Sequence, residues 1–192
     1  MNKMPVGIDD FREIRERYYF VDKTYFIKEL IDDRSKVTLI TRPRRFGKTL
    51  TMSMLHYFFT LENAAENRAL FDGCAIADAG EKYMAEQGSR PVVFLTLKDV
   101  KVNTFKLCVD TMTYRISRLY DSFNFLLDSD RLSVTQKKLY SDTLDRCVTQ
   151  EMTANSLQFL CTCLESHFDK KPILLIDEYD APIQTAWEYG YY

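Results

Sequence analysis

The chain has 192 residues, of which 46% are hydrophobic and 28% are charged, enough apolar material for one globular domain with a core. Its 26 basic and 28 acidic residues leave a net charge of −2, so nothing in the charge balance favours direct binding to nucleic acid or to an anionic membrane. No apolar stretch approaches the roughly 20 residues of a membrane-spanning helix. No signal peptide is evident, and we interpret the five cysteines as reduced thiols of a cytoplasmic protein.

Apolar periodicity predicts helices that alternate with strands along the chain. In chain order, the pattern indicates a helix over about 24–31, a buried strand over 37–41, a helix over about 50–59, short helices and loops over 61–90, a strand over 92–97, a long helix over about 105–123, a polar helical segment over 128–150, a helix over about 157–168 and a strand over 173–176. Such alternation is typical of an α/β fold around a parallel sheet. We expect one domain over residues 1–192.

A basic loop lies between the first predicted strand and the helix that follows it, and it ends in Gly47, Lys48 and Thr49. A nucleoside triphosphate needs backbone N–H donors and a cation. A loop that joins a strand to the N-terminus of a helix supplies these donors. Glycine lets the backbone approach the phosphates, lysine reaches the β- and γ-phosphates, and the threonine hydroxyl joins the Mg²⁺ shell. We therefore predict a Mg-ATP site here, with Lys48 also catalytic and Thr49 a metal ligand.

The loop departs from the standard phosphate-binding pattern at its first position. That pattern is Gly, four residues, then Gly-Lys-Ser/Thr, whereas Arg42 occupies the first place here. Taken alone, the tripeptide Gly47-Lys48-Thr49 is equally consistent with a surface turn.

A second motif ends the third predicted strand, where four apolar residues precede Asp177 and Glu178. Two adjacent carboxylates at the end of a buried strand make little sense as packing. In a nucleotide-binding sheet, Asp177 would hold Mg²⁺ and Glu178 would act as the catalytic base that polarises the attacking water. An acidic loop start is the alternative for this pair alone, but the order and placement of the two motifs favour a nucleotide site.

Several segments together carry a family resemblance over nearly the whole chain: residues 5–11, 19–24, 42–50, 91–98 and 175–182. In these segments the sequence resembles the bacterial AAA-ATPase-like family, whose members commonly carry a PD-(D/E)XK nuclease-like domain downstream. The loop Arg-Pro-Arg-Arg-Phe-Gly-Lys is specific to that family, so Arg42 is the family's own variant. The resemblance implies that Arg44, Arg45, Phe46 and Leu50 bind nucleotide together with Gly47, Lys48 and Thr49.

The resemblance also implies a three-layer α/β/α P-loop NTPase fold of the additional-strand type. In that fold a later strand lies between strands 37–41 and 173–176, and too few residues follow Glu178 to supply it. We therefore expect an N-terminal fragment without the inserted strand and without the nuclease-like domain. The two strands should then be separated by a gap or collapsed together, and the isolated chain should be unstable, aggregate or pair with another chain.

The implied partners are the nucleotide and the downstream nuclease-like domain. The sequence is compatible with a homo-oligomer. Nucleic acid is expected only indirectly, through a downstream domain, and no membrane partner is expected.

Other polar residues admit two interpretations each. The isolated histidines His56 and His167 favour structural roles over metal binding. Arg44 and Arg45 contact the γ-phosphate or a partner, or are solvated charges. Asp180 caps the next helix or supports Mg²⁺, with capping favoured. Residues 18–24 pack on adenine or, as we favour, begin a helix with Asp22 as its cap.

Two function classes follow. The first is an ATPase with Glu178 as base and Lys48 and Mg²⁺ stabilising charge on the γ-phosphate. The second is an ATP-gated switch or scaffold that binds nucleotide without turnover and acts through partners. The adjacent carboxylates favour hydrolysis, and a DNA-translocating motor gains no support from the slightly acidic composition.

Overall fold

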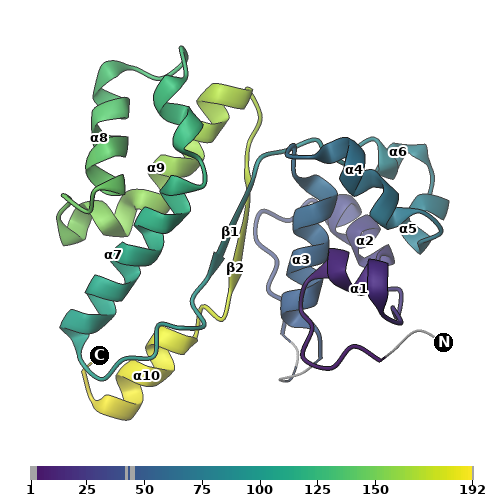
Figure 1. Ribbon diagram of the computed structural model, residues 1–192, viewed down its shortest axis with the longest axis horizontal. Helices are drawn as coiled ribbons and strands as arrows, with labels where there is room; N and C mark the ends of the chain where they lie inside the picture. Colours follow the sequence, from purple (N-terminus) through teal and green to yellow (C-terminus); the bar gives the residue numbers. More distant parts are fainter. Residues whose placement is uncertain (1–3, 42, 44–45, 192) are drawn as a thin grey trace. The chain divides into compact units, whose positions relative to one another are not determined.

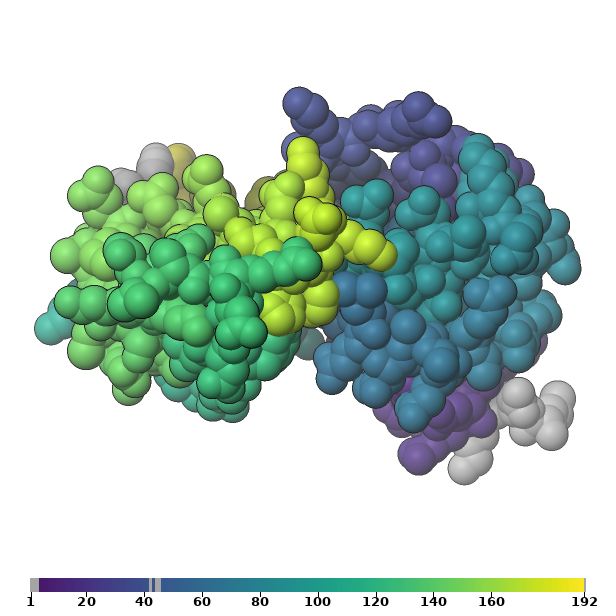
Figure 2. Space-filling view, turned by 90° about the horizontal axis from the view of Figure 1, so that it is seen from above, coloured from purple at the N-terminus to yellow at the C-terminus, as the bar shows by residue number. Residues whose placement is uncertain are grey.

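The computed structural model describes residues 4–41, 43 and 46–191, and its contacts divide the chain into two compact units, Met1–Val92 and Val93–Tyr192. The side chains of each unit fill a compact body (Figure 2). The first unit is helical in its described part: α1 (Phe11–Arg17), α2 (Tyr25–Asp33), α3 (Lys48–Phe59), α4 (Ala64–Arg68), η1 (Ala69–Phe71), α5 (Ala75–Asp78) and α6 (Glu81–Met84).

Aromatic rings hold the first unit together. The ring of Phe71 lies 5.1 Å from that of Phe11 in α1 and 5.1 Å from that of Phe58 in α3, and all three side chains are fully buried. Phe20 packs edge-on against Phe11 at 5.4 Å. Aromatic side chains bury the largest areas per residue, so this cluster joins α1 and α3 to η1.

The strand predicted over 37–41 is wrong. Residues 37–41 form neither strand nor helix, and Val37 and Leu39 are 86% and 62% exposed. β-branched residues favour a strand only where a neighbouring strand satisfies their backbone groups, and 37–41 has no such ladder in the described chain. Since no strand forms over 37–41, the predicted gap or collapse between that strand and strand 173–176 does not arise.

The second unit combines two strands with helices. Its elements are β1 (Val92–Thr96), which starts at the last residue of the first unit, α7 (Phe105–Asp121), η2 (Asn124–Asp128), α8 (Val134–Leu144), α9 (Gln150–Phe168), β2 (Ile173–Asp177) and α10 (Ala181–Tyr189). The strands β1 and β2 pair as a two-stranded parallel sheet, with α7, α8 and α9 together on one side of them (Figure 1). The predicted strands over 92–97 and 173–176 and the helices over 105–123 and 157–168 are thus confirmed.

A single apolar cluster forms the core of this unit. Val93 and Leu95 of β1 pack with Tyr120 of α7, Tyr140 of α8 and Leu160 of α9, all buried. Alternate residues of a strand point to the same face, which is why Val93 and Leu95 both reach the helices. The core therefore fixes β1 against all three helices.

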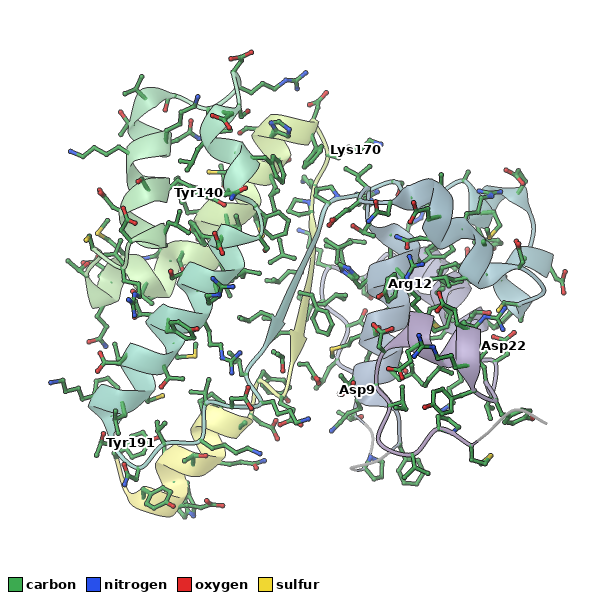
Figure 3. All side chains as sticks on the ribbon, viewed as in Figure 1. Asp9, Arg12, Asp22, Tyr140, Lys170 and Tyr191 are labelled. Atoms are coloured by element: carbon green, nitrogen blue, oxygen red, sulfur yellow. The ribbon has the colours of Figure 1, made fainter. Side chains whose placement is uncertain are left out.

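Buried tyrosine hydroxyls add specific hydrogen bonds to this core. Tyr140, labelled in Figure 3, lies among the helices of this unit. Its Oη donates to the carbonyls of Tyr120 and Phe123 at 2.8 and 3.0 Å, and Tyr120 Oη donates to the carbonyl of Ser156 at 2.7 Å. Burial raises the pKa of Tyr120 and of Tyr140 above the ordinary value. Both hydroxyls therefore stay protonated and serve as donors between α7, α8 and α9.

The architecture is mixed α/β with a small parallel sheet, as the alternation of elements predicts. Two strands are described, so the three-layer P-loop arrangement stays a prediction. No helix among the described residues is both long and apolar enough to cross a membrane.

Candidate functional site

The phosphate-loop motif ends at a left-handed residue directly before a helix. Gly47 has φ 74° and occupies the N-cap position of α3, which begins at Lys48. The N–H and the hydroxyl of Thr51 both donate to the Gly47 carbonyl at 2.9 Å. The predicted helix start is confirmed, and because glycine has no side chain, no cap of its own covers the N–H groups of the first turn.

Helix α3 is anchored in the first unit by its apolar face. Met54, Leu55 and Phe58 are buried, and the Ser53 hydroxyl accepts a hydrogen bond from the Phe11 N–H at 2.9 Å. The apolar face predicted from periodicity is thus the one that packs. Because this face is buried, the N-terminus of α3 has a fixed position within the first unit.

The predicted nucleotide-binding residues differ in exposure. Phe46 is 61% exposed, and its N–H donates to the Pro43 carbonyl at 3.3 Å. Lys48, Thr49 and Leu50 are partly buried in the first turn of α3. The predicted contributions of Arg44 and Arg45, and the variant position Arg42, lie outside the described residues.

Two polar side chains, Asp22 and the buried Thr24, hold the segment before the loop. Asp22 Oδ1 accepts hydrogen bonds from the Thr24 N–H and hydroxyl at 2.8 and 2.7 Å, and Asp22 Oδ2 accepts from the Ala75 N–H at 2.7 Å. The Thr24 hydroxyl accepts from the Ile76 N–H at 3.1 Å. The predicted role of Asp22 as cap of its own helix is wrong, since Thr24 is the N-cap of α2 and Asp22 binds instead at the start of α5.

These hydrogen bonds set the ionisation of Asp22. Burial by itself would raise the pKa of its carboxyl, but the N–H groups of Ala75 and Thr24 and the Thr24 hydroxyl outweigh burial and lower the pKa below the ordinary value. Hydrogen bonds donated to a carboxylate favour its charged form. Asp22 therefore stays ionised and already has three donors.

Residue Lys23 lies between these two anchored neighbours and reaches the phosphate loop. A side-chain carbon added at Gly47 would lie 3.8 Å from Lys23 Nζ. Lys23 itself is exposed. Sequence reasoning missed this lysine as a site residue, although it lies inside the segment 19–24 that carries the family resemblance.

The carboxylate motif ends β2, as predicted. Asp177 is the last residue of the strand and is 3% exposed. Its Oδ1 accepts from the Glu178 N–H at 3.0 Å, and its carbonyl accepts from the Leu97 N–H at 2.9 Å. These contacts orient the Asp177 carboxylate at the carboxyl end of the sheet, where α/β proteins place ligands.

Glu178 takes a conformation that is uncommon for its type. Its φ is 51°, in the left-handed region that costs non-glycine residues on the order of 1–3 kcal/mol. Its carboxylate pairs with Lys101 at 3.9 Å. Sequence reasoning did not single out Lys101, because the two residues come together only when β1 and β2 pair.

The two motifs belong to different units, with Gly47 in the first and Asp177 in the second. Oxygen ligands such as the Thr49 hydroxyl and the Asp177 carboxylate are the kind that Mg²⁺ prefers. The donor chemistry of both motifs therefore fits a magnesium nucleotide.

Residue Asp180 does not act as the predicted side-chain cap. It occupies the N-cap position of α10 but makes no side-chain cap hydrogen bond, and its carboxylate accepts from Gln184 Nε2 at 2.7 Å instead. The helical φ and ψ of Asp180, −81° and −16°, differ from the extended conformation that a capping side chain normally requires.

The two histidines lie in packed surroundings. The His56 ring lies 5.5 Å from that of Tyr57, and His167 Nδ1 contacts the Ser129 hydroxyl at 2.8 Å beside the ring of Phe168. Among the described residues, no group of three or more His, Cys, Asp or Glu side chains could hold a metal ion. The five cysteines are all free thiols.

The family described as "Predicted AAA-ATPase" (AAA-ATPase-like) matches residues 5–192. The chain belongs to this AAA-ATPase-like family. The match covers both units and both motifs, and it confirms the resemblance read from the loop 42–50 and the segment 175–182. The description of the family is that of a predicted ATPase.

Other comparisons are narrower. A protein described as "Uncharacterized protein in vnfD 5'region", from Azotobacter chroococcum mcd 1, is 44% identical to this AAA-ATPase-like chain over 78 residues, which are 40% of this chain and 14% of that relative. The match thus spans a small part of the relative's length. No solved structure matches this chain.

Proposed function

We propose that this AAA-ATPase-like chain binds Mg-ATP on the loop that ends at Gly47, and that the protein hydrolyses it. The observation that carries the proposal is the start of α3 at Lys48 directly after the left-handed Gly47. This geometry puts a lysine and a hydroxyl residue in the first helical turn, where N–H groups and the helix dipole favour phosphate. Membership of the family supports the choice of nucleotide.

Each residue has a distinct role in this proposal. Lys48 contacts the β- and γ-phosphates and stabilises charge that develops on the γ-phosphate. The Thr49 hydroxyl and the Asp177 carboxylate would hold Mg²⁺, which when bound neutralises phosphate charge. Glu178 accepts a proton from the attacking water. Arg44, Arg45, Phe46 and Leu50 complete the nucleotide-binding loop.

The wider setting is part of the same proposal. Residues 1–192 would form one P-loop NTPase domain of the additional-strand type, in a cytoplasmic protein, with the nucleotide as its ligand. A nuclease-like domain that follows in the whole protein would receive the effect of ATP binding and would be the route to any nucleic acid.

A second function, a switch that binds ATP without turnover, is favoured by one observation. Glu178 is already paired with Lys101 at 3.9 Å and has a left-handed backbone. The ion pair with Lys101 engages the carboxylate that would have to face the attacking water. The two functions differ in whether Glu178 is needed for turnover.

The Lys48→Ala variant tests the binding site. Lys48 is partly exposed at a helix start, so the variant should fold, and loss of a charge-assisted contact should weaken ATP binding by about tenfold or more. Isothermal titration calorimetry with Mg-ATP measures the affinity, and circular dichroism confirms the fold. An unchanged affinity in a folded variant would reject the site.

The variants Asp177→Ala and Glu178→Gln should separate metal binding from catalysis. We expect Asp177→Ala to remove the magnesium dependence of ATP binding. Glu178→Gln should keep ATP affinity and lose turnover by about 10²–10⁴-fold, because a general base acts only once water attacks. Phosphate release by the whole protein is the assay. Turnover equal to that of the parent in Glu178→Gln would show that Glu178 is not the base.

A further inference from the structure

The segment 22–24 has a geometry that packing alone does not explain. Asp22 and Thr24 both direct their side chains to the start of α5, where they bind the N–H groups of Ala75 and Ile76. Thr24 is fully buried. Lys23 lies between these two residues and is exposed. Its side chain reaches Gly47, the residue directly before α3.

The charge of Lys23 has no anionic partner in the described part of the chain. None of the seven ion pairs found there includes Lys23. The adjacent Asp22 carboxylate is occupied by the three donors from Thr24 and Ala75. The ammonium of Lys23 lies near the start of α3, where Lys48 carries a second positive charge. Such a grouping of positive charges is electrostatically unfavourable unless an anion is bound.

We propose that Lys23 is a second phosphate-binding lysine beside the loop that ends at Gly47, and that it contacts the same polyphosphate as Lys48. This inference rests on the proposed ATP site. The hydrogen bonds of Asp22 and Thr24 fix the backbone on either side of Lys23, so binding does not have to order that backbone. Its ammonium lies beside Gly47, the residue whose missing side chain lets a phosphate approach the backbone.

The Lys23→Met variant tests this role because it keeps the side-chain length and removes the charge. Its affinity should be measured by calorimetry for two probes, Mg-ATP and magnesium tripolyphosphate. We expect both to bind about tenfold more weakly, as for loss of a charge-assisted contact. Lys23→Arg, which keeps the charge, should stay within about threefold of the parent.

Controls separate the failure of this inference from failure of the site. Lys106→Met removes an exposed lysine of α7 in the other unit and should bind both probes like the parent. Lys48→Ala reports on the loop itself. Circular dichroism checks folding, and Lys23→Gln provides a second neutral variant if Lys23→Met does not fold.

Three results would overturn the inference. If Lys48→Ala loses ATP while Lys23→Met binds as the parent does, the site stands and Lys23 is a surface lysine. If Lys23→Met weakens ATP but not tripolyphosphate, Lys23 contacts the nucleoside and not the phosphates. If the parent chain binds neither probe, the proposed function and this inference fail together.

Discussion

At Gly47 the backbone takes a φ of 74° just before helix α3 begins. A side-chain carbon there would meet Lys23 Nζ at 3.8 Å and Leu50 Cβ at 4.0 Å, both ordinary contacts. Space therefore does not require glycine, and the left-handed conformation does. The residue that the nucleotide motif demands is also the one that the local backbone demands.

The Gly47→Ala variant isolates this conformational requirement. An L-residue in the left-handed region costs about 1–2 kcal/mol, and no clash adds to that cost. We expect the free energy of unfolding, measured by urea denaturation, to fall by about that amount. Ser35→Ala, at an exposed position of the same unit, should change it by less than about 0.5 kcal/mol. Equal midpoints for the two variants would show that Gly47 is not held left-handed.

At the scale of elements, short helices depend on contacts from distant segments. Helix α5 has four residues, Ala75–Asp78, and its N-cap Cys74 makes no side-chain cap hydrogen bond. The N–H groups at its start bind Asp22 and Thr24, more than 50 residues earlier. Four-residue helices are not stable alone, so these side chains substitute for a local cap.

Replacing Thr24 by Val should destabilise the first unit through this link. Valine has a similar shape but leaves the buried Ile76 N–H without its acceptor and Asp22 without one donor. A buried polar group left without its partner costs about 1–3 kcal/mol. Thr24→Ser keeps the hydroxyl and should cost less, about 1 kcal/mol for one methyl group. Urea denaturation in which Val is as stable as the parent would contradict this role.

For the whole molecule, two groups of the first unit link stability to pH in the same direction. Burial lowers the pKa of His56 below its ordinary value, against the opposing charges of Glu62 and Asp10. The pKa of Asp22 is also lowered, because its hydrogen bonds outweigh burial. In both cases the unfolded chain binds the proton more readily than the folded chain, so stability falls as the pH falls.

The two windows are separate. The contribution of His56 is complete above its unfolded pKa of about 6.5 and is lost as the pH falls through the lower folded value. That of Asp22 is complete above about 4 and is lost only in more acidic solution. We expect the free energy of unfolding to fall between pH 7.5 and pH 5.5 in the parent, and to fall less in His56→Gln. The same pH slope in both proteins would show that His56 is not the source.

The amino-acid sequence by itself determined the elements whose signal is local. Helices α7 and α9 follow from apolar residues at helical spacing, and β1 and β2 from short apolar runs after proline. The helix after Gly47 follows from the apolar periodicity of residues 50–59. Asp177 and Glu178 directly follow the apolar run of β2, which places them at the end of that strand. These features need only the neighbours of each residue in the chain.

Only the tertiary structure decided the features that depend on partners far along the chain. Residues 37–41 have the composition of a strand, but a strand exists only with a partner, and the described chain supplies none to them. Asp22 looks like a helix cap until folding brings it to Ala75, and Lys101 meets Glu178 only because β1 pairs with β2. Periodicity reports which face of an element is apolar, whereas hydrogen-bond and charge partners are set by chain packing, which no local pattern encodes.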